Sequence, residues 1–182
     1  MTRTQVHQQI QLGSVAPRFD ALLAADGKRY SIDSLADADV LVVVFISNGC
    51  PTVRGYGERL KALQADYQDA HVSVIAVNAN NPHLSPADTY EEMVSRADEA
   101  GYNFPYLQDA SGELARSLGA VSTPHAFVFD RARRLRYRGG IDDSRNPAKV
   151  SRSDLREAVV ELLENDKVTV PETQPFGCAI VW

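Results

Sequence analysis

The stretch VLVVVFISNGCPTVR, residues 40–54, joins an unbroken apolar run to a polar loop that holds Cys50. The run Val40–Ile46 is rich in β-branched residues, which is typical of a strand buried on both faces. A second run of this kind, VSVIAVN, lies at Val72–Asn78. Between the runs, apolar residues at helical spacing predict a helix: Val53, Tyr56, Leu60, Leu63 and Tyr67. Two strands joined through a helix predict a parallel βαβ unit.

The segments on either side extend this α/β pattern. Extended pieces at Phe19–Leu22 and Tyr30–Ile32 flank a turn at Asp26-Gly27, which predicts a hairpin-like entry. A helix is expected from an N-cap at Ser85, with Pro86 at the first helical position, to a stop at Gly101. The chain then predicts a short helix at Gly112–Leu118, an antiparallel pair HAFVFD and RLRYRG that turns at Arg131–Arg133, and a last helix at about Ser153–Leu163.

The composition limits the number of domains, the partners and the cellular location that we expect for this chain. The 182 residues are 44% hydrophobic and suit one globular domain, residues 1–165, followed by a tail at 166–182. The net charge of −5 argues against nucleic acid or an anionic membrane as the main partner. We read the arginines of RARRLRYR as the solvated side of a half-buried strand. No membrane span or N-terminal secretory signal is recognisable, so we expect a cytoplasmic protein.

Cys50 has the setting of a reactive thiol. It is expected at the carboxyl end of a parallel strand and at the start of a helix, where free N–H groups stabilise a thiolate. The alternative is a buried structural thiol, the commonest state of a free cysteine. Cys178, the chain's other cysteine, lies in the tail, so a disulfide-built scaffold is not expected. The four histidines and two cysteines show no ligand spacing, and we expect neither a metal nor a cofactor.

Several segments resemble a known superfamily. FISNGCPTVRGYGERL resembles the active-site segment of the thioredoxin superfamily, and VSTPHAFVFD resembles its cis-proline segment. The opening LGSVAPRFDALLAADGKRYSIDSL, with IDDSR and GCAIVW later, is similar to peroxiredoxin-like and alkyl hydroperoxide reductase-like redoxins. The resemblance implies a thioredoxin-like fold: a central mixed sheet flanked by helices, with an N-terminal β-hairpin extension and a C-terminal tail. It also implies a cis peptide bond between Thr123 and Pro124, facing Cys50.

The same comparison shows where the motifs depart from the pattern. Val53 stands where thioredoxins carry a second cysteine, so a Cys-X-X-Cys disulfide cannot form. Ser47 can supply the hydroxyl of the peroxiredoxin peroxide motif, but Val43 stands in place of its proline. We therefore expect single-thiol chemistry at Cys50. A peroxide would oxidise its thiolate to a sulfenic acid, and Cys178 or an external thiol would reduce it.

Other residues are candidates for roles around Cys50. Thr52 lies within its motif. Arg54 is expected one turn into the helix, where it either holds the thiolate or orients a peroxide, or else is a surface arginine. His125 follows the cis-proline and is expected either to approach the sulfur as a base or a positive charge, or to be an exposed loop histidine. The resemblance implies an arginine beside the cysteine, for which Arg138 and Arg145 are candidates.

Two other functions stay open: a thiol–disulfide oxidoreductase that acts through a mixed disulfide at Cys50, and a non-catalytic binding or sensor module. The expected partners are a peroxide or disulfide substrate and an external reductant, either thioredoxin-like or a small thiol. Cys178 could reach Cys50 of the same chain or of a second copy, and the apolar end AIVW suggests a homodimer surface or packing on the domain.

Overall fold

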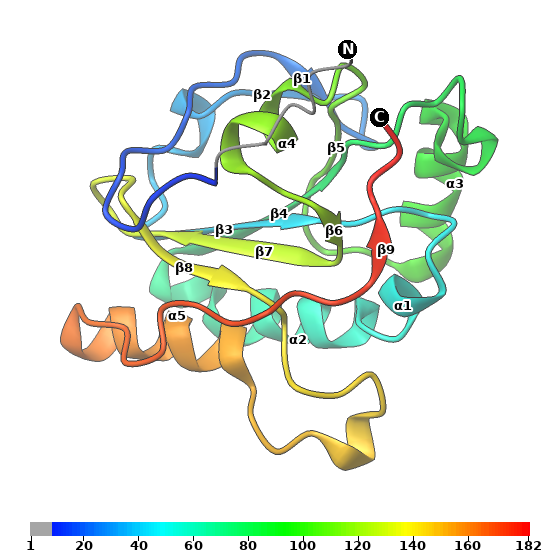
Figure 1. Ribbon diagram of the computed structural model, residues 1–182. Coiled ribbons are helices and arrows are strands. Elements are labelled where there is room, and N and C mark those ends of the chain that lie inside the picture. Colours follow the sequence, from blue (N-terminus) through cyan, green and yellow to red (C-terminus); the bar gives the residue numbers. More distant parts are fainter. Residues whose placement is uncertain (1–8) are drawn as a thin grey trace, which may run out of the picture.

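The computed structural model describes residues 9–182 and contains a five-stranded mixed β-sheet (Figure 1). Its spatial order is β5-β4-β3-β7-β8, with β3 parallel to β4, β4 parallel to β5, and β7 antiparallel to both β3 and β8. The strands are β3 (Val40–Phe45), β4 (Val72–Asn78), β5 (Tyr106–Gln108), β7 (His125–Phe129) and β8 (Leu135–Gly139). The expected fold, with its mixed central sheet and flanking helices, is confirmed.

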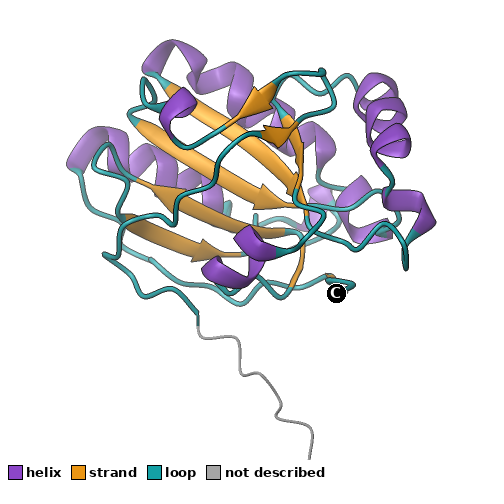
Figure 2. Cartoon of the chain, turned by 90° about the horizontal axis from the view of Figure 1, so that it is seen from above, coloured by secondary structure: helices purple, strands orange, loops and turns teal. Residues whose placement is uncertain are grey.

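Both faces of the sheet are covered (Figures 1 and 2). Because side chains alternate along a strand, the even-numbered residues of β3 join one apolar cluster and the odd-numbered residues join another. Helices α2 (Gly57–Tyr67), α3 (Tyr90–Ala100) and α5 (Asp154–Asn165) contribute to the first cluster. Helix α4 (Glu113–Leu118) and the segment around the hairpin of β1 (Leu22–Leu23) and β2 (Arg29–Tyr30) contribute to the second.

Two local predictions need correction, and one strand was not predicted. The helix expected from Val53 to Tyr67 is broken into α1 (Pro51–Arg54) and α2, which begins after Tyr56. Ser85 precedes only the short 3-10 helix Pro86–Asp88, while Thr89 caps α3 by accepting a hydrogen bond from the N–H of Glu92 (3.4 Å). Strand β5 was not predicted, because three residues after a proline are too short to show a period. The other 3-10 helices are Asp33–Leu35, Gln68–Ala70 and Pro147–Lys149.

The tail, residues 166–182, lies along the domain of its own chain (Figure 1). Its middle part follows β8, where the Arg138 N–H donates to Pro171 O and the Thr173 N–H donates to Arg138 O. Gly139 permits this approach, because a Cβ there would lie 2.2 Å from Thr173 Oγ1. The tail then forms β9 (Cys178–Ala179), which pairs antiparallel with β6 (Ser122–Thr123). This pairing brings the tail to the cis-proline segment.

Strand β8 has the alternation that its sequence predicts. Leu135 and Tyr137 are fully buried, whereas Arg136 and Arg138 are partly exposed. The two arginines do not simply face water: Arg136 pairs with Asp130 at 3.0 Å, and Arg138 pairs with Glu172 of the tail at 3.1 Å.

No helix within residues 9–182 is long and apolar enough to cross a membrane. The expectation that the N-terminal segment lacks a secretory signal concerns in part residues 1–8, which lie outside the described residues.

Candidate active site

Cys50 lies where the central strand β3 leads through a short loop into α1. It adopts an extended conformation as the N-cap of α1, and Pro51 occupies the first helical position. The side chain is only 2% exposed and belongs to the apolar cluster on the helical face of the sheet. In the thiol form it makes no regular capping hydrogen bond. Burial by itself would suit a structural thiol, so its polar neighbours decide its chemistry.

The segment opposite Cys50 is the predicted cis-proline segment. The Thr123–Pro124 peptide bond is cis, as predicted. The Cys50 thiol donates to the carbonyl oxygen of Thr123 at 3.3 Å, and the hydroxyls of Ser47 and Thr123 are hydrogen-bonded at 3.1 Å. Ser47 and Thr123 are both buried. The structure therefore brings Cys50, Ser47, Thr123 and Pro124 together from distant parts of the chain.

Cys178 meets Cys50 through the β6–β9 pairing. Its backbone is the register partner of Thr123, whose carbonyl oxygen accepts the Cys50 hydrogen bond. Gly177 lets the tail come this close, because a Cβ there would lie 1.9 Å from Thr123 O. Both cysteines are free, and their side chains interact by hydrogen bonding. The Cys50 side chain raises the pKa of the Cys178 thiol, and the backbone and side chain of Thr52 lower it by less.

The two thiols differ in acidity. Burial raises the pKa of Cys50, but hydrogen bonds to the thiolate from the Cys178 side chain, the Val53 N–H and Thr123 outweigh it, so that the pKa falls below the usual value for cysteine. The hydrogen bond to Cys50 raises the pKa of Cys178, and burial and the negative charge of the Cys50 thiolate act in the same direction. The proton therefore stays on Cys178, and Cys50 is the better nucleophile.

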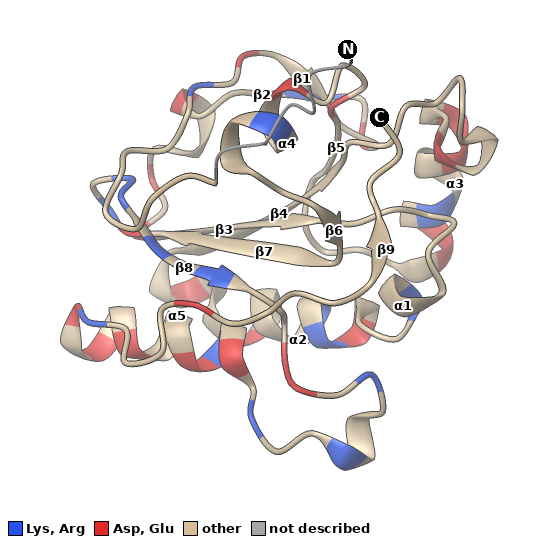
Figure 3. Ribbon diagram, viewed as in Figure 1, with Lys and Arg blue, Asp and Glu red and all other residues tan. Residues whose placement is uncertain are grey.

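Hydrogen bonds, rather than nearby charges, stabilise this thiolate. Residues 117–129 and 173–182, which contain β6 and β9, include no Lys, Arg, Asp or Glu (Figure 3). Among the described residues, no arginine side chain is hydrogen-bonded or ion-paired to Cys50. Arg138 instead donates to Ile10 O and pairs with Glu172. Arg54 lines a hollow between α1 and α3, and the backbone oxygen of Arg145 accepts a hydrogen bond from Arg59 at 2.6 Å.

His125 differs from both of its predicted states. It is neither an exposed loop residue nor a base at neutral pH, because it lies in β7 and is 1% exposed. Its Nδ1 accepts a hydrogen bond from the N–H of Val121 at 3.3 Å. Burial, reinforced by the positive charge of Arg138, lowers its pKa to about 4. A neutral His125 cannot supply the positive charge that the sequence suggested.

A buried polar network behind Cys50 was not predicted. Asp88 is 1% exposed and lies beside the loop that precedes Cys50. It accepts hydrogen bonds from the Asn48 N–H and from three side chains: Asn78, Asn80 and Ser85. The polar run NANNPHLSPAD after β4 was the available signal, since it begins at the carboxyl end of a parallel strand. Its partner Asn48 is contributed by a different segment, which sequence spacing does not reveal.

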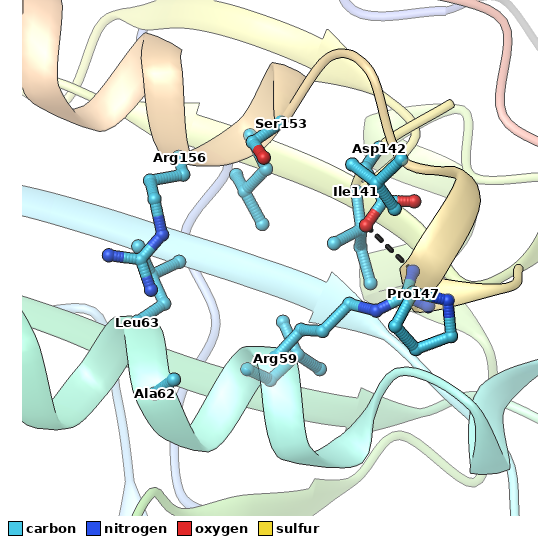
Figure 4. Close-up of a pocket in the computed structure, with 11 residues that line it drawn as sticks. Arg59, Ala62, Leu63, Ile141, Asp142, Pro147, Ser153 and Arg156 are labelled. Carbon is cyan, nitrogen blue, oxygen red and sulfur yellow. Dashed lines mark hydrogen bonds and ion pairs between the residues drawn. The ribbon is translucent and has the colours of Figure 1, made fainter. Parts of the chain in front are cut away.

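A separate cleft lies between α2, α5 and the loop 141–153 (Figure 4). It has a volume of about 270 Å³ and contains neither cysteine. Arg59 at one end pairs with buried Asp142 at 2.7 Å and donates to the carbonyl oxygens of Ser144 and Arg145. These contacts hold the loop in place, so the cleft has a structural explanation. Within residues 9–182, no group of three or more His, Cys, Asp or Glu side chains could hold a metal ion.

Comparisons with known proteins agree with the fold. The model of the Redoxin family matches residues 11–159. A hypothetical protein from Sinorhizobium meliloti is 36% identical, with a TM-score of 0.88, and the match covers 96% of each chain.

More distant structures share the fold alone. Peroxidoxin BcpB from Mycobacterium tuberculosis is 16% identical with a TM-score of 0.61, covering 85% of this chain and 95% of its own. A thiol:disulfide interchange protein from Chlorobium tepidum is 19% identical with a TM-score of 0.65, covering 86% and 99%. No curated protein gives a significant match.

Proposed function

This chain belongs to the Redoxin family, within the thioredoxin superfamily, and we propose that it is a two-cysteine thiol peroxidase. In this proposal Cys50 attacks the peroxide and Cys178 resolves the product. The observation that carries it is the β6–β9 pairing, which sets Cys178 opposite Thr123, the residue whose carbonyl oxygen accepts the Cys50 hydrogen bond, with the lowered pKa on Cys50 and the raised pKa on Cys178.

The reaction balances with these two groups. The Cys50 thiolate attacks one peroxide oxygen, the O–O bond breaks, and the departing alkoxide or hydroxide takes up a proton to leave as an alcohol or water. Cys50 is then a sulfenic acid. The Cys178 sulfur attacks it, an S–S bond forms, and the hydroxyl leaves as water. Because the tail already holds Cys178 against Cys50, the second step needs no search by a distant segment.

An external thiol completes the cycle by reducing the disulfide. Two reductant thiols are consumed and leave as a disulfide. Cys178 is partly exposed, whereas Cys50 is 2% exposed, so the reductant reaches Cys178 more easily and Cys50 departs as the more stable thiolate. A thioredoxin-like protein or a small thiol in a reducing compartment such as the cytoplasm would fit this step.

Disulfide exchange is the second candidate function. It is favoured by the lack of an arginine contact to Cys50 among the described residues and by Val43 in place of the motif proline. It would use the same pair, with Cys50 forming a mixed disulfide and Cys178 releasing the substrate. The burial of Cys50 argues for a small oxidant over a protein disulfide, and for this reason we place peroxide first.

The test compares both oxidants on three proteins. Reduced wild-type, Cys50→Ser and Cys178→Ser proteins are mixed separately with hydrogen peroxide and with a small disulfide, and thiol loss is followed over time. We expect fast oxidation of the wild-type protein by peroxide, none at this rate in Cys50→Ser, and a trappable sulfenic acid in Cys178→Ser. Fast reaction with the disulfide alone would replace the peroxidase proposal with disulfide exchange. Slow reaction with both oxidants would leave a non-catalytic module.

A further inference from the structure

The segments that carry the two cysteines share a buried support behind the site. Asp88 receives the backbone N–H of Asn48 on Oδ1 at 2.7 Å, two residues before Cys50. Its other oxygen, Oδ2, receives Nδ2 of Asn80 at 2.9 Å. Asn80 Oδ1 then accepts the backbone N–H of Val181 at 2.9 Å, three residues after Cys178.

The tail end is held at this point by a second bond. The carbonyl oxygen of Val181 accepts the N–H of Asn81 at 2.7 Å, so both polar backbone groups of Val181 are engaged by neighbouring asparagines. The red end of the tail in Figure 1 lies beside the segment that follows β4. The Cys178 segment is therefore fixed on one side by β6 and on the other by Asn80 and Asn81.

We infer that Asp88 is a positioning residue for the redox reaction: one carboxylate fixes the Cys50 loop directly and the Cys178 segment through Asn80, and so sets the approach of the two sulfurs. This inference rests on the proposed function. It assigns to Asp88 no contact with substrate. Its role is to hold the Cys50 and Cys178 sulfurs in the positions from which they form the S–S bond.

The role requires a carboxylate in particular. Asp88 accepts four hydrogen bonds, two on each oxygen, and its burial is offset by these donors, which keep its pKa below the usual range. An asparagine has one oxygen and therefore cannot satisfy both sides. If its oxygen faces Asn48, its amide group faces Asn80. Asn80 could accept from that amide only by turning its own amide group towards the Val181 N–H.

Either orientation of an asparagine at position 88 thus releases one cysteine segment. With the oxygen towards Asn80, the N–H of Asn48 loses its acceptor and the Cys50 loop is released. With the oxygen towards Asn48, the Val181 attachment is lost and the Cys178 segment is released. Asp88 thus has two attachments: one to the Asn48 N–H, and one through Asn80 to the Val181 N–H. Because a hydrogen bond to a charged group is stronger than a neutral one, losing either attachment corresponds to about a tenfold change in an equilibrium constant.

The experiment measures the effective molarity of the Cys50–Cys178 disulfide in a dithiol redox buffer. Asp88→Asn tests the attachments to Asn48 and to Val181 together, and Asn80→Ala removes the attachment to Val181 alone. Asp109→Asn is the matched control, because Asp109 is also a buried carboxylate, 2% exposed, but its side chain accepts from Ala115 at the start of α4. We expect a fall of about tenfold for Asp88→Asn and for Asn80→Ala, with Asp109→Asn within about twofold of wild type even if it is less stable.

A second readout separates this inference from the proposed function. Amide hydrogen exchange at Val181 is measured in a Cys50→Ser background, where no disulfide can form. Faster exchange on adding Asp88→Asn, but not Asp109→Asn, supports the positioning role even if the wild-type protein forms no disulfide and the proposed function fails. If Asp88→Asn does not fold, Asn80→Ala decides. A folded Asp88→Asn protein with wild-type effective molarity and unchanged Val181 exchange would overturn the inference.

Discussion

Replacing Gly177 by alanine tests whether the tail places Cys178 against Cys50. A Cβ at this position would lie 1.9 Å from Thr123 O, 2.7 Å from Thr123 C and 3.1 Å from Pro124 Cδ. The obstacles are backbone and a proline ring, which cannot rotate away. To bring the shortest distance to 3.0 Å, the tail has to move by about 1.1 Å, away from β6. A displacement of about 1 Å at a reacting group can lower a rate by about 10²-fold.

We therefore expect Gly177→Ala to slow disulfide formation from the Cys50 sulfenic acid about 100-fold, when both proteins are compared at a pH where Cys50 is fully ionised. The fold should persist, because β6 and β9 form a separate pair outside the five-stranded sheet. The assay is acid quenching after mixing with one equivalent of hydrogen peroxide, followed by quantification of the linked peptides. Trp182, the chain's single tryptophan, lies over Arg116 and reports tail displacement by fluorescence.

Gly57→Ala is the control for this substitution. A Cβ at Gly57 would lie 3.8 Å from the Tyr102 ring, an ordinary contact, and Gly57 is the first residue of α2. Disulfide formation in Gly177→Ala at the wild-type rate, in a folded protein, would show that the tail does not need this position to deliver Cys178 and would refute the reasoning.

Three further predictions follow from the same contacts. In Cys178→Ala, loss of the thiol donor should shift the pH midpoint of Cys50 alkylation upward, towards the ordinary cysteine value, which iodoacetamide kinetics would show; an unchanged midpoint would contradict the assigned hydrogen bond. The unfolded chain binds a proton at His125 near pH 6.5 but the folded chain only near pH 4, so stability should fall by about 3 kcal/mol as the pH drops through this window. Denaturant titrations of His125→Gln should lack that part of the slope. Arg59→Leu leaves the buried Asp142 unpaired and should cost about 3 kcal/mol of unfolding free energy while peroxide oxidation of Cys50 is unchanged; a slowed oxidation would tie the cleft to the site.

Sequence patterns predicted the sheet because the composition of its central strands shows that they are buried. Val40–Phe45 and Val72–Asn78 are buried on both faces, as continuous β-branched runs indicate. The cis bond at Pro124 came from a resemblance to known motifs, and not from periodicity. The helix break at Gly55–Tyr56 and the true cap at Thr89 were missed, because local spacing permits several starts and tertiary packing selects among them.

The contacts of the site could be predicted only in part. The position of Cys50 followed from the order of strand and helix, since that order fixes which edge of the sheet a loop occupies. The contact with Cys178 depends on the path of a tail with little regular structure, which no local pattern encodes. His125 was misjudged because its neighbour Pro124 suggested a loop, whereas it pairs with Phe45 inside the sheet. The partners of Asp88 come from two segments, the loop at Asn48 and the run that begins at the end of β4, so the network emerges only when the sheet is assembled.

The central claim is that Cys50 and Cys178 of one chain form a single redox pair. Peptide mapping without reduction, after one equivalent of hydrogen peroxide at low protein concentration, tests it most directly. We predict one intrachain disulfide joining the peptides of Cys50 and Cys178, with no free thiol left and no covalent dimer. A sulfenic or sulfinic acid on Cys50 beside an intact Cys178 thiol, or a disulfide between two chains, would contradict the claim.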